Sequence, residues 1–215
     1  MKNHYCFFIC ISMVMLSLSA FGQSGYIAWP AREDTIIVPP NTNLRDFIVQ
    51  DTAGTLWQGS GATTKWQNGT RVYVLRANER YTWGPQLALA VANRKLFIRG
   101  EYGKSYLVPS TLTSDWKPRI VGSPNVSGFL SLEAANLVVS LKNLALAPYD
   151  ALAEPTNLDN VNANLLSVQN SGSASLYADS CIFSTYTLVF QTFGRIYTVR
   201  VQNSISVDHG TQAKN

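Results

Sequence analysis

The sequence has few of the residues that most often carry chemistry: three cysteines and two histidines in 215 residues. His4, Cys6 and Cys10 lie in an N-terminal segment that is predicted to be removed, which leaves Cys181 and His209. One cysteine cannot form an intramolecular disulfide, so packing and backbone pairing must stabilise the fold. A Ser-His-Asp triad, a Cys-His pair or a multi-histidine zinc site would need a better-placed histidine. These classes, and any metal site built on them, are not expected.

Charge of one sign is nowhere concentrated in the sequence. Lys and Arg number 17 against 13 Asp and Glu, and the basic residues are scattered singly. A nucleic-acid-binding protein normally gathers its basic residues on one face, so no nucleic-acid partner is expected. An ordinary solvated surface explains the distribution. A shallow basic groove for an anionic polysaccharide can still be assembled from residues that are distant in sequence.

Residues 1–22 are predicted to be a cleaved signal peptide. Lys2 supplies a short positive segment, and Cys6–Leu18 form an almost unbroken apolar run. Ser19–Gly22 then offer small residues for cleavage close to Gln23. The run is short for a membrane span and no stop-transfer pattern follows it, so a membrane anchor is the second interpretation. We therefore predict a secreted protein, extracellular or at the cell surface.

Short strand-like runs dominate the rest of the chain, and Gly, Asn, Ser, Asp and Pro separate them. The best helical candidate is Gln86–Asn93, and even this segment alternates apolar and polar residues. The sequence predicts an all-β fold with these strand regions: Arg71–Ala77, Lys95–Gly100, Arg119–Gly122, Gly128–Leu132, Leu137–Leu146, Asn164–Val168, Ser175–Phe183, Tyr186–Phe190 and Arg195–Val207.

Three of these segments form a repeat: "SLKNLAL" (140–146), "YADSCIF" (177–183) and "VRVQNSIS" (199–206). The preferred alignment places Asn143, Ser180 and Asn203 in one column. Leu144, Cys181 and Ser204 then share the next inward column, and Leu146, Phe183 and Ser206 the one after it. The spacing from Ser180 to Asn203 is about one coil of a right-handed parallel β-helix. The spacing from Asn143 to Ser180 is one coil plus an insertion, visible at 148–162.

An asparagine inside an apolar strand has a physical role at a bend between two strands. Asparagine tolerates unusual backbone angles, and its amide can bond to backbone groups that the bend leaves without ladder partners. Stacked polar residues of this kind form a structural ladder, here Asn143, Ser180 and Asn203. Cys181 is then a small inward hydrophobic residue and not a nucleophile. Two alternatives remain: a shift by one residue would put Asp179 in this column, or the asparagines are unrelated loop residues.

From about Thr42 onward the chain resembles the N-terminal part of secreted bacterial right-handed β-helix proteins, the pectate-lyase-like superfamily. The segments that carry the likeness are "RVYVLRANERYTW" (71–83), "RKLFIRGEYG" (94–103), "KPRIVGS" (117–123) and the "LKNLAL" segment, with "TNLRDFIVQDTAG" (42–54) similar to the leader. The resemblance implies a fold more than a reaction, because this fold hosts lyases, hydrolases, epimerases, adhesins and spacers.

Candidate site residues are few. Calcium-dependent lyases of this superfamily need clustered carboxylates with an Arg or Lys base, and galacturonase-like hydrolysis needs a set of aspartates. The aspartates here come mostly one to a segment, at Asp115, Asp150, Asp159, Asp179 and Asp208. Lys142, Arg195 and Arg200 can line one face. The tryptophans Trp57, Trp66, Trp83 and Trp116 either stack on sugar rings or pack in the N-terminal cap. The candidate glycan contacts are therefore Lys142, Trp83 and Trp116, and the catalytic residues are unknown.

The sequence thus predicts a short right-handed parallel β-helix of about four to five coils over 71–215, incomplete at its C-terminal end, preceded by a leader or cap region over 23–70. The expected role is structural, or binding to a polysaccharide or cell-surface glycan, without a cofactor. The alternative is a pectate-lyase-like polysaccharide lyase or hydrolase, with its site in the groove or in a missing C-terminal part, for which Ca²⁺ is an option. A β-sandwich binding domain is a third interpretation. Because the last strands are apolar on one side, the C-terminal coil is expected to self-associate.

Overall fold

The computed structural model describes residues 29–53, 69–101, 117–122, 128–147, 164–184 and 188–207. The chain divides into two compact units, Met1–Ala31 and Arg32–Asn215. Only Trp29–Ala31 of the first unit are among the described residues, so the predicted signal peptide lies outside them. The strands, the helix and the candidate site all belong to the second unit.

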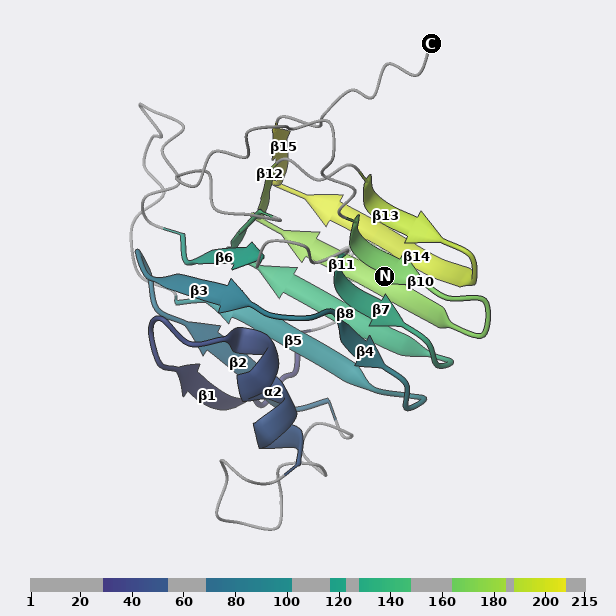
Figure 1. Ribbon diagram of the computed structural model, residues 1–215, viewed down its shortest axis with the longest axis horizontal. Helices are drawn as coiled ribbons and strands as arrows, with labels where there is room; N and C mark the ends of the chain where they lie inside the picture. Colours follow the sequence, from purple (N-terminus) through teal and green to yellow (C-terminus); the bar gives the residue numbers. More distant parts are fainter. Residues whose placement is uncertain are drawn as a thin grey trace, which may run out of the picture. The chain divides into compact units, whose positions relative to one another are not determined.

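Three parallel sheets make up the described fold (Figure 1). Sheet A contains, in spatial order, β1 (Asp34–Val38), β2 (Arg71–Leu75), β5 (Lys95–Gly100), β8 (Leu137–Lys142), β11 (Ser173–Asp179) and β14 (Arg195–Gln202). Sheet B contains β3 (Arg80–Trp83), β6 (Arg119–Gly122), β9 (Ala145–Ala147), β12 (Ile182–Ser184) and β15 (Ile205–Val207). Sheet C contains β4 (Leu87–Leu89), β7 (Gly128–Leu132), β10 (Asn164–Val168) and β13 (Leu188–Thr192).

The chain visits the three sheets in a fixed cycle. From β2 onward, successive strands belong to sheets A, B and C in turn, and each strand pairs with the strand three places later. Every pairing between the described strands is parallel. The predicted all-β class is therefore confirmed. The antiparallel β-sandwich is wrong, because a sandwich of that kind pairs its strands in opposite directions.

Among the described residues one helix accompanies the sheets: α2 (Leu44–Thr52), in a region that we expected to be a leader without assigning a helix to it. Asn43 caps its N-terminus by accepting a hydrogen bond from the Asp46 backbone N–H, and Leu44 and Ile48 are fully buried in the core. The helical candidate Gln86–Asn93 instead contains strand β4. No helix in the described part of the chain is long and apolar enough to span a membrane.

The interior is filled by columns of apolar side chains from equivalent strands. On sheet A, alternate residues face the interior, so that parallel register stacks like positions on one another. One column runs through Leu96, Val139, Leu176 and Val199, and a second through Ile98, Leu141, Ala178 and Val201. The first three members of each column are at most 5% exposed. On β14, the strand at one edge of the sheet, Val199 is 45% and Val201 46% exposed.

Helix α2 closes the opposite end of the interior through a buried ion pair. Arg71 on β2 donates to both carboxylate oxygens of Asp51, from Nε at 2.9 Å and from Nη2 at 2.8 Å. Both side chains are fully buried. The Tyr73 hydroxyl also donates to Asp51 Oδ2 at 2.9 Å, and Asp34 on β1 accepts from Arg71 Nη1 at 2.7 Å. Burial, and next the negative charge of Asp51, raise the pKa of Tyr73. The predicted leader thus supplies both the first strand of sheet A and a cap.

The corners between sheets differ in length. Between sheets A and B the chain turns within two residues at 143–144, 180–181 and 203–204, whereas the two earlier connections between these sheets span 76–79 and 101–118. Between sheets B and C the connections span 84–86, 123–127, 148–163 and 185–187. The strands after 148–163 keep their parallel register with those before it. The three two-residue turns therefore repeat in structure, whereas the other connections vary in length.

Candidate functional site

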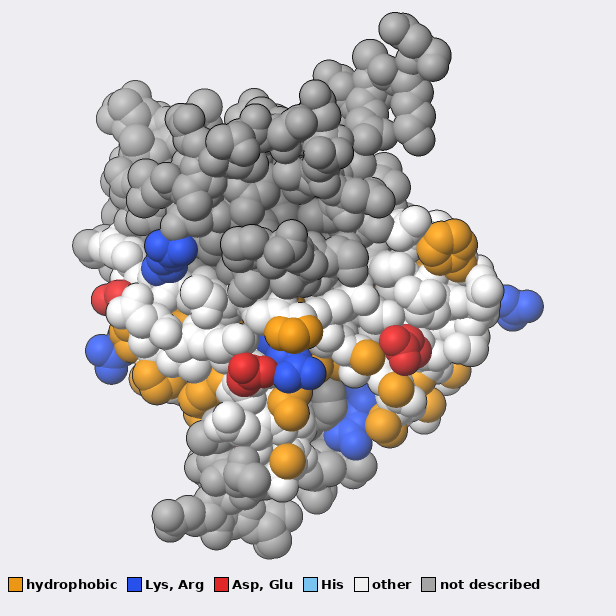
Figure 2. All heavy atoms as spheres, viewed as in Figure 1, with side chains coloured by type: hydrophobic (Ala, Val, Ile, Leu, Met, Phe, Trp, Pro, Cys, Tyr) orange, Lys and Arg blue, Asp and Glu red, His pale blue; other side chains and the backbone are white. Residues whose placement is uncertain are grey.

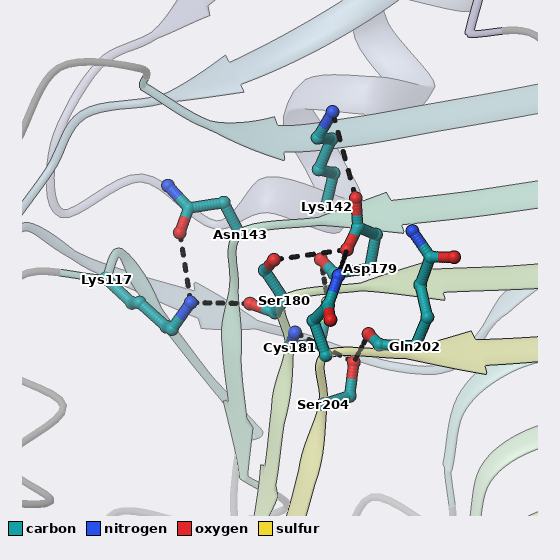
Figure 3. Close-up of polar contacts among 9 residues, drawn as sticks. Lys117, Lys142, Asn143, Asp179, Ser180, Cys181, Gln202 and Ser204 are labelled. Carbon is teal, nitrogen blue, oxygen red and sulfur yellow. Dashed lines mark hydrogen bonds and ion pairs between the residues drawn. The ribbon is translucent and has the colours of Figure 1, made fainter. Parts of the chain in front are cut away.

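Polar side chains gather at the short corner between sheets A and B. We call this group the polar corner: Lys117, Lys142, Asn143, Asp179, Ser180, Cys181, Gln202, Asn203 and Ser204 (Figure 3). It is built by three equivalent turns. Lys142 pairs with Asp179 and Asp179 with Gln202, so the residues that follow them come to the same level. The observed register therefore groups Ser180, not Asp179, with Asn143 and Asn203.

All three turn residues have left-handed backbone angles: φ is 56° at Asn143, 55° at Ser180 and 50° at Asn203. Asparagine adopts this conformation more readily than most residues because its short amide can bond locally. Serine is less suited to it, and Ser180 is held by bonds in two directions. Its backbone N–H donates to Gln202 O at 3.1 Å, and its hydroxyl donates to Asp179 Oδ1 at 3.1 Å.

Asn143 is only 3% exposed and joins three successive levels of the stack. Its amide Nδ2 donates to Glu101 O at 3.2 Å, and its backbone N–H donates to Asp179 O at 2.9 Å. The backbone carbonyl oxygen of Asn143 lies so close to β5 that a Cβ added at Gly100 would be 2.3 Å from it. This approach requires glycine at that position. Asn143 stands among leucines because, at the bend, it forms hydrogen bonds with backbone carbonyl groups of the neighbouring repeats.

Asn203 differs from the expectation that both asparagines point inward. Its side chain is exposed, and its Nδ2 donates to Asp179 Oδ1 at 3.0 Å. Only the Asn143 end of the column is covered by neighbouring strands on both sides, because β14 lies at the edge of sheet A. The inward orientation therefore holds for Asn143 and is wrong for Asn203.

Lys117, like Gln202, is a member of the polar corner that the sequence did not single out. It lies just before β6, is only 5% exposed, and donates from Nζ to Asn143 Oδ1 at 3.0 Å and to the backbone carbonyl of Ser180. Burial lowers the pKa of Lys117 to about 8, while Cys181 and Asp179 act in the opposite direction. An amine with such a pKa can serve as a base in principle. Here both named acceptors are turn oxygens, so the amine links neighbouring repeats.

Cys181 is a buried, inward residue, 1% exposed, as the column of Leu144 and Ser204 leads one to expect. Burial raises the pKa of its thiol to about 12. The thiol donates weakly to Asp179 O at 3.4 Å, and the Cys181 backbone N–H donates to Ser204 Oγ at 3.0 Å. A thiol with this pKa is almost entirely protonated at neutral pH, which makes it a poor nucleophile.

Asp179 is the acidic side chain of the polar corner. Besides the bonds from Ser180 and Asn203, its Oδ2 lies 3.8 Å from Lys142 Nζ. The carboxylate is thus held by donors from its own strand and from the strands on both sides. Among the described residues there is no group of three or more His, Cys, Asp or Glu side chains placed to hold a metal ion. The arrangement links three repeats electrostatically at one corner.

The candidate glycan contacts fall into three different environments. Trp83 is 1% exposed, and its ring lies on Phe129 with the ring centroids 3.7 Å apart. It is therefore a core residue, and the prediction that it contacts a glycan is wrong because no face of the indole reaches solvent. Lys142 has a side chain 29% exposed on the outer side of sheet A. Trp116, like Trp57, Trp66, Asp115, Asp150, Asp159 and Asp208, lies outside the described residues.

Basic side chains occupy outward positions on sheet A. Arg200 stands between the inward Val199 and Val201, level with Tyr177 on β11, while Lys142 precedes the corner on β8. Arg195 begins β14 and is exposed. The side chains that we expected to line a face, Lys142, Arg195 and Arg200, therefore do share the outer face of this sheet.

A second polar ladder was missed by the sequence analysis. Asn93 and Asn136 precede β5 and β8 at the corner that enters sheet A, with φ of 62° and 57°. Asn136 Nδ2 donates to Asn93 Oδ1 at 3.2 Å, so the amides stack directly. The signal was available, since an asparagine stands shortly before each of these strand-like runs.

Comparisons of the chain with protein-family models, curated proteins and solved structures found no match.

Proposed function

We propose that the protein is a secreted right-handed parallel β-helix module, with a structural role or a role in binding glycans at a cell surface. The observation that carries the proposal is the fixed cycle of three parallel sheets, in which strands one cycle apart pair in parallel. One full cycle of strands corresponds to one coil of such a helix, and stacking coils bury one another's apolar columns. The secretory N-terminus and the right-handed winding are parts of the proposal, supported by the sequence pattern of residues 1–22 and by the strong preference of parallel crossovers for that hand.

The polar corner supports the structural side of the proposal. Lys117 donates to turn oxygens on two repeats, and Asp179 accepts from donors on its own and adjacent repeats. Buried polar groups that are satisfied within the fold stabilise it and specify its register. The positions of Lys117 and Asp179 are explained by these contacts, which join neighbouring coils to one another.

The outer face of sheet A supports the binding side. Lys142 and Arg200 project from β8 and β14 of the same sheet, Lys142 level with Asp179 and Arg200 level with Tyr177 on the strand between them, and neighbouring strands are about 4.8 Å apart. Cationic side chains along such a face match the regularly spaced carboxylates of an acidic polysaccharide. We therefore assign anionic glycans as the ligand class of a binding role, with Lys142 and Arg200 as contacts in place of the buried Trp83.

Affinity electrophoresis in gels that contain either polygalacturonate or neutral dextran tests this role. The native chain is expected to be retarded by the acidic polymer only, and Lys142→Ser and Arg200→Ala are expected to reduce the retardation. Arg80→Ala removes one exposed arginine from sheet B and is the matched control. Equal retardation by both polymers, or equal loss in all three variants, would contradict binding at sheet A. Release of unsaturated or reducing sugars during incubation would favour the polysaccharide lyase or hydrolase instead.

A further inference from the structure

The interior of the stack reaches the surface at β14. Val199 and Val201 occupy the same inward columns as side chains that are at most 5% exposed in the three preceding sheet A strands, yet they are 45% and 46% exposed. Phe193 and Tyr197, beside them, are 58% and 60% exposed. Figure 2 shows a hydrophobic group at the surface where Figure 1 draws the β13–β14 connection. We call these four side chains the end surface.

The end surface coincides with a strand edge. β14 pairs with β11 on one side and is the last strand in the order of sheet A. An edge strand with apolar inward positions is a template for pairing with another chain, unless charge or proline blocks it. The inward positions of β14 are Ile196, Val199 and Val201, and none of them is charged. The single irregularity is a bulge at Tyr197, which falls between the residues paired with Ala174 and Ser175.

The other end of the same interior does not offer a complementary surface. There α2 covers the first repeat with Leu44 and Ile48, and the ion pair of Asp51 and Arg71 is fully buried. Head-to-tail stacking of two molecules would therefore set the apolar end surface against a finished cap. Two copies can bury their end surfaces only by bringing like ends together, which gives a closed two-fold contact and not a filament.

We propose that the end surface is the contact between two copies of this chain, joined through antiparallel pairing of β14 with β14. A register centred on Val199 places the two Val199 residues opposite each other. It also sets Tyr197 across from Val201 and Arg200 across from Thr198, so that no two like charges meet.

Sedimentation velocity and light scattering on the secreted chain at micromolar concentration test the dimer. The native protein is expected to be a dimer, and Val199→Lys is expected to weaken it at least about tenfold by placing a charge in the contact. Ile37→Lys is the matched control: Ile37 is 51% exposed on β1, at the opposite edge of sheet A. This variant is expected to dimerise like the native chain.

Val199→Cys supplies a second readout that does not depend on destabilising anything. Residues opposite each other in antiparallel strands have Cα atoms about 4.5–5.5 Å apart, within disulfide range. Mild oxidation is expected to give a covalent dimer with Val199→Cys and none with Ile37→Cys, while buried Cys181 stays unreacted. A native chain that is monomeric throughout, as it would be if residues 208–215 cover the end surface, overturns the proposal. So do dimers that respond to Ile37→Lys and not to Val199→Lys, and so do open-ended oligomers.

Discussion

At the buried ion pair between Asp51 and Arg71, a substitution that nearly preserves the shape of the side chain should lower the free energy of unfolding most. Asp51→Asn keeps the shape of the side chain but removes its charge, and Arg71 remains fully buried with one of its two carboxylates gone. Breaking a buried pair by removing one partner typically costs about 3–5 kcal/mol. Asp34, 2.7 Å from Arg71 Nη1, retains part of the compensation, so the lower end, about 3 kcal/mol, is expected. Against a total stability of about 5–15 kcal/mol, this loss is severe.

Urea denaturation followed by tryptophan fluorescence and circular dichroism measures the effect. Asp46→Asn, on the same helix, is the control: its pair with Arg45 is partly exposed and worth at most about 1 kcal/mol. The double variant Asp51→Leu with Arg71→Met should recover most of the loss, because apolar residues of similar volume often replace a buried pair without penalty. If Asp51→Asn unfolds at the same urea concentration as Asp46→Asn, the ion pair does not anchor the cap and the reasoning is refuted.

Three further outcomes are expected at the polar corner. Asn143→Leu should lower the free energy of unfolding by about 1–3 kcal/mol in urea titrations, because Glu101 O and Lys117 lose a hydrogen-bond partner. Asn143→Gly should cost less, because glycine accepts the positive φ of this position. Equal losses in the two variants would argue against backbone strain at residue 143. Cys181 should react with a thiol reagent only after denaturation, since it is buried with a pKa of about 12, and rapid labelling of native protein would contradict its position. Burial lowers the pKa of Lys117 in the folded state to about 8, below the ordinary 10.5, so between these pH values the folded state binds fewer protons than the unfolded state. The free energy of unfolding, measured relative to Lys117→Met, should therefore stay flat below pH 8 and rise by up to about 3 kcal/mol from pH 8 to pH 10.5. A difference that falls with pH would show that the amine is stabilised in its charged form.

The sequence could predict the short corners because their constraints are local. An asparagine or serine with φ near 55° must sit at the bend, the next residue must be small or apolar and inward, and two-residue connections keep the spacing fixed. Asn143, Ser180 and Cys181 were therefore assigned to columns that agree with the observed register. Asn203 has the same backbone but not the same burial, because burial depends on which strand lies alongside.

The cap and Lys117 could not be predicted because their roles depend on distant partners. Helix α2 is stabilised by hydrogen bonds that Asp51 accepts from Arg71, a residue separated from it by a long connection. The apolar residues of the helix recur too weakly at helical spacing to show a clear apolar face. Lys117 precedes a strand like many surface lysines do, and only the assembled corner reveals that its amine is enclosed. Trp83 is buried by Phe129 from another repeat, and a tryptophan near a turn gives no sign of that neighbour.

The uneven corners have a consequence for how such a chain can change over generations. Between sheets B and C the connection is 84–86 in one repeat and 148–163 in another, and the strands on either side still pair in register. At the corner between sheets A and B, three turns share a two-residue length and left-handed geometry, so a single added residue would displace Lys117 and Asp179 from their partners. Between an earlier pair of strands of sheets A and B the connection is also long, at 101–118. Deletions and new segments should therefore accumulate in the connections that already vary in length and be purged at the three two-residue turns. A designer wishing to graft a foreign loop onto this scaffold would choose 185–187 and leave 180–181 untouched.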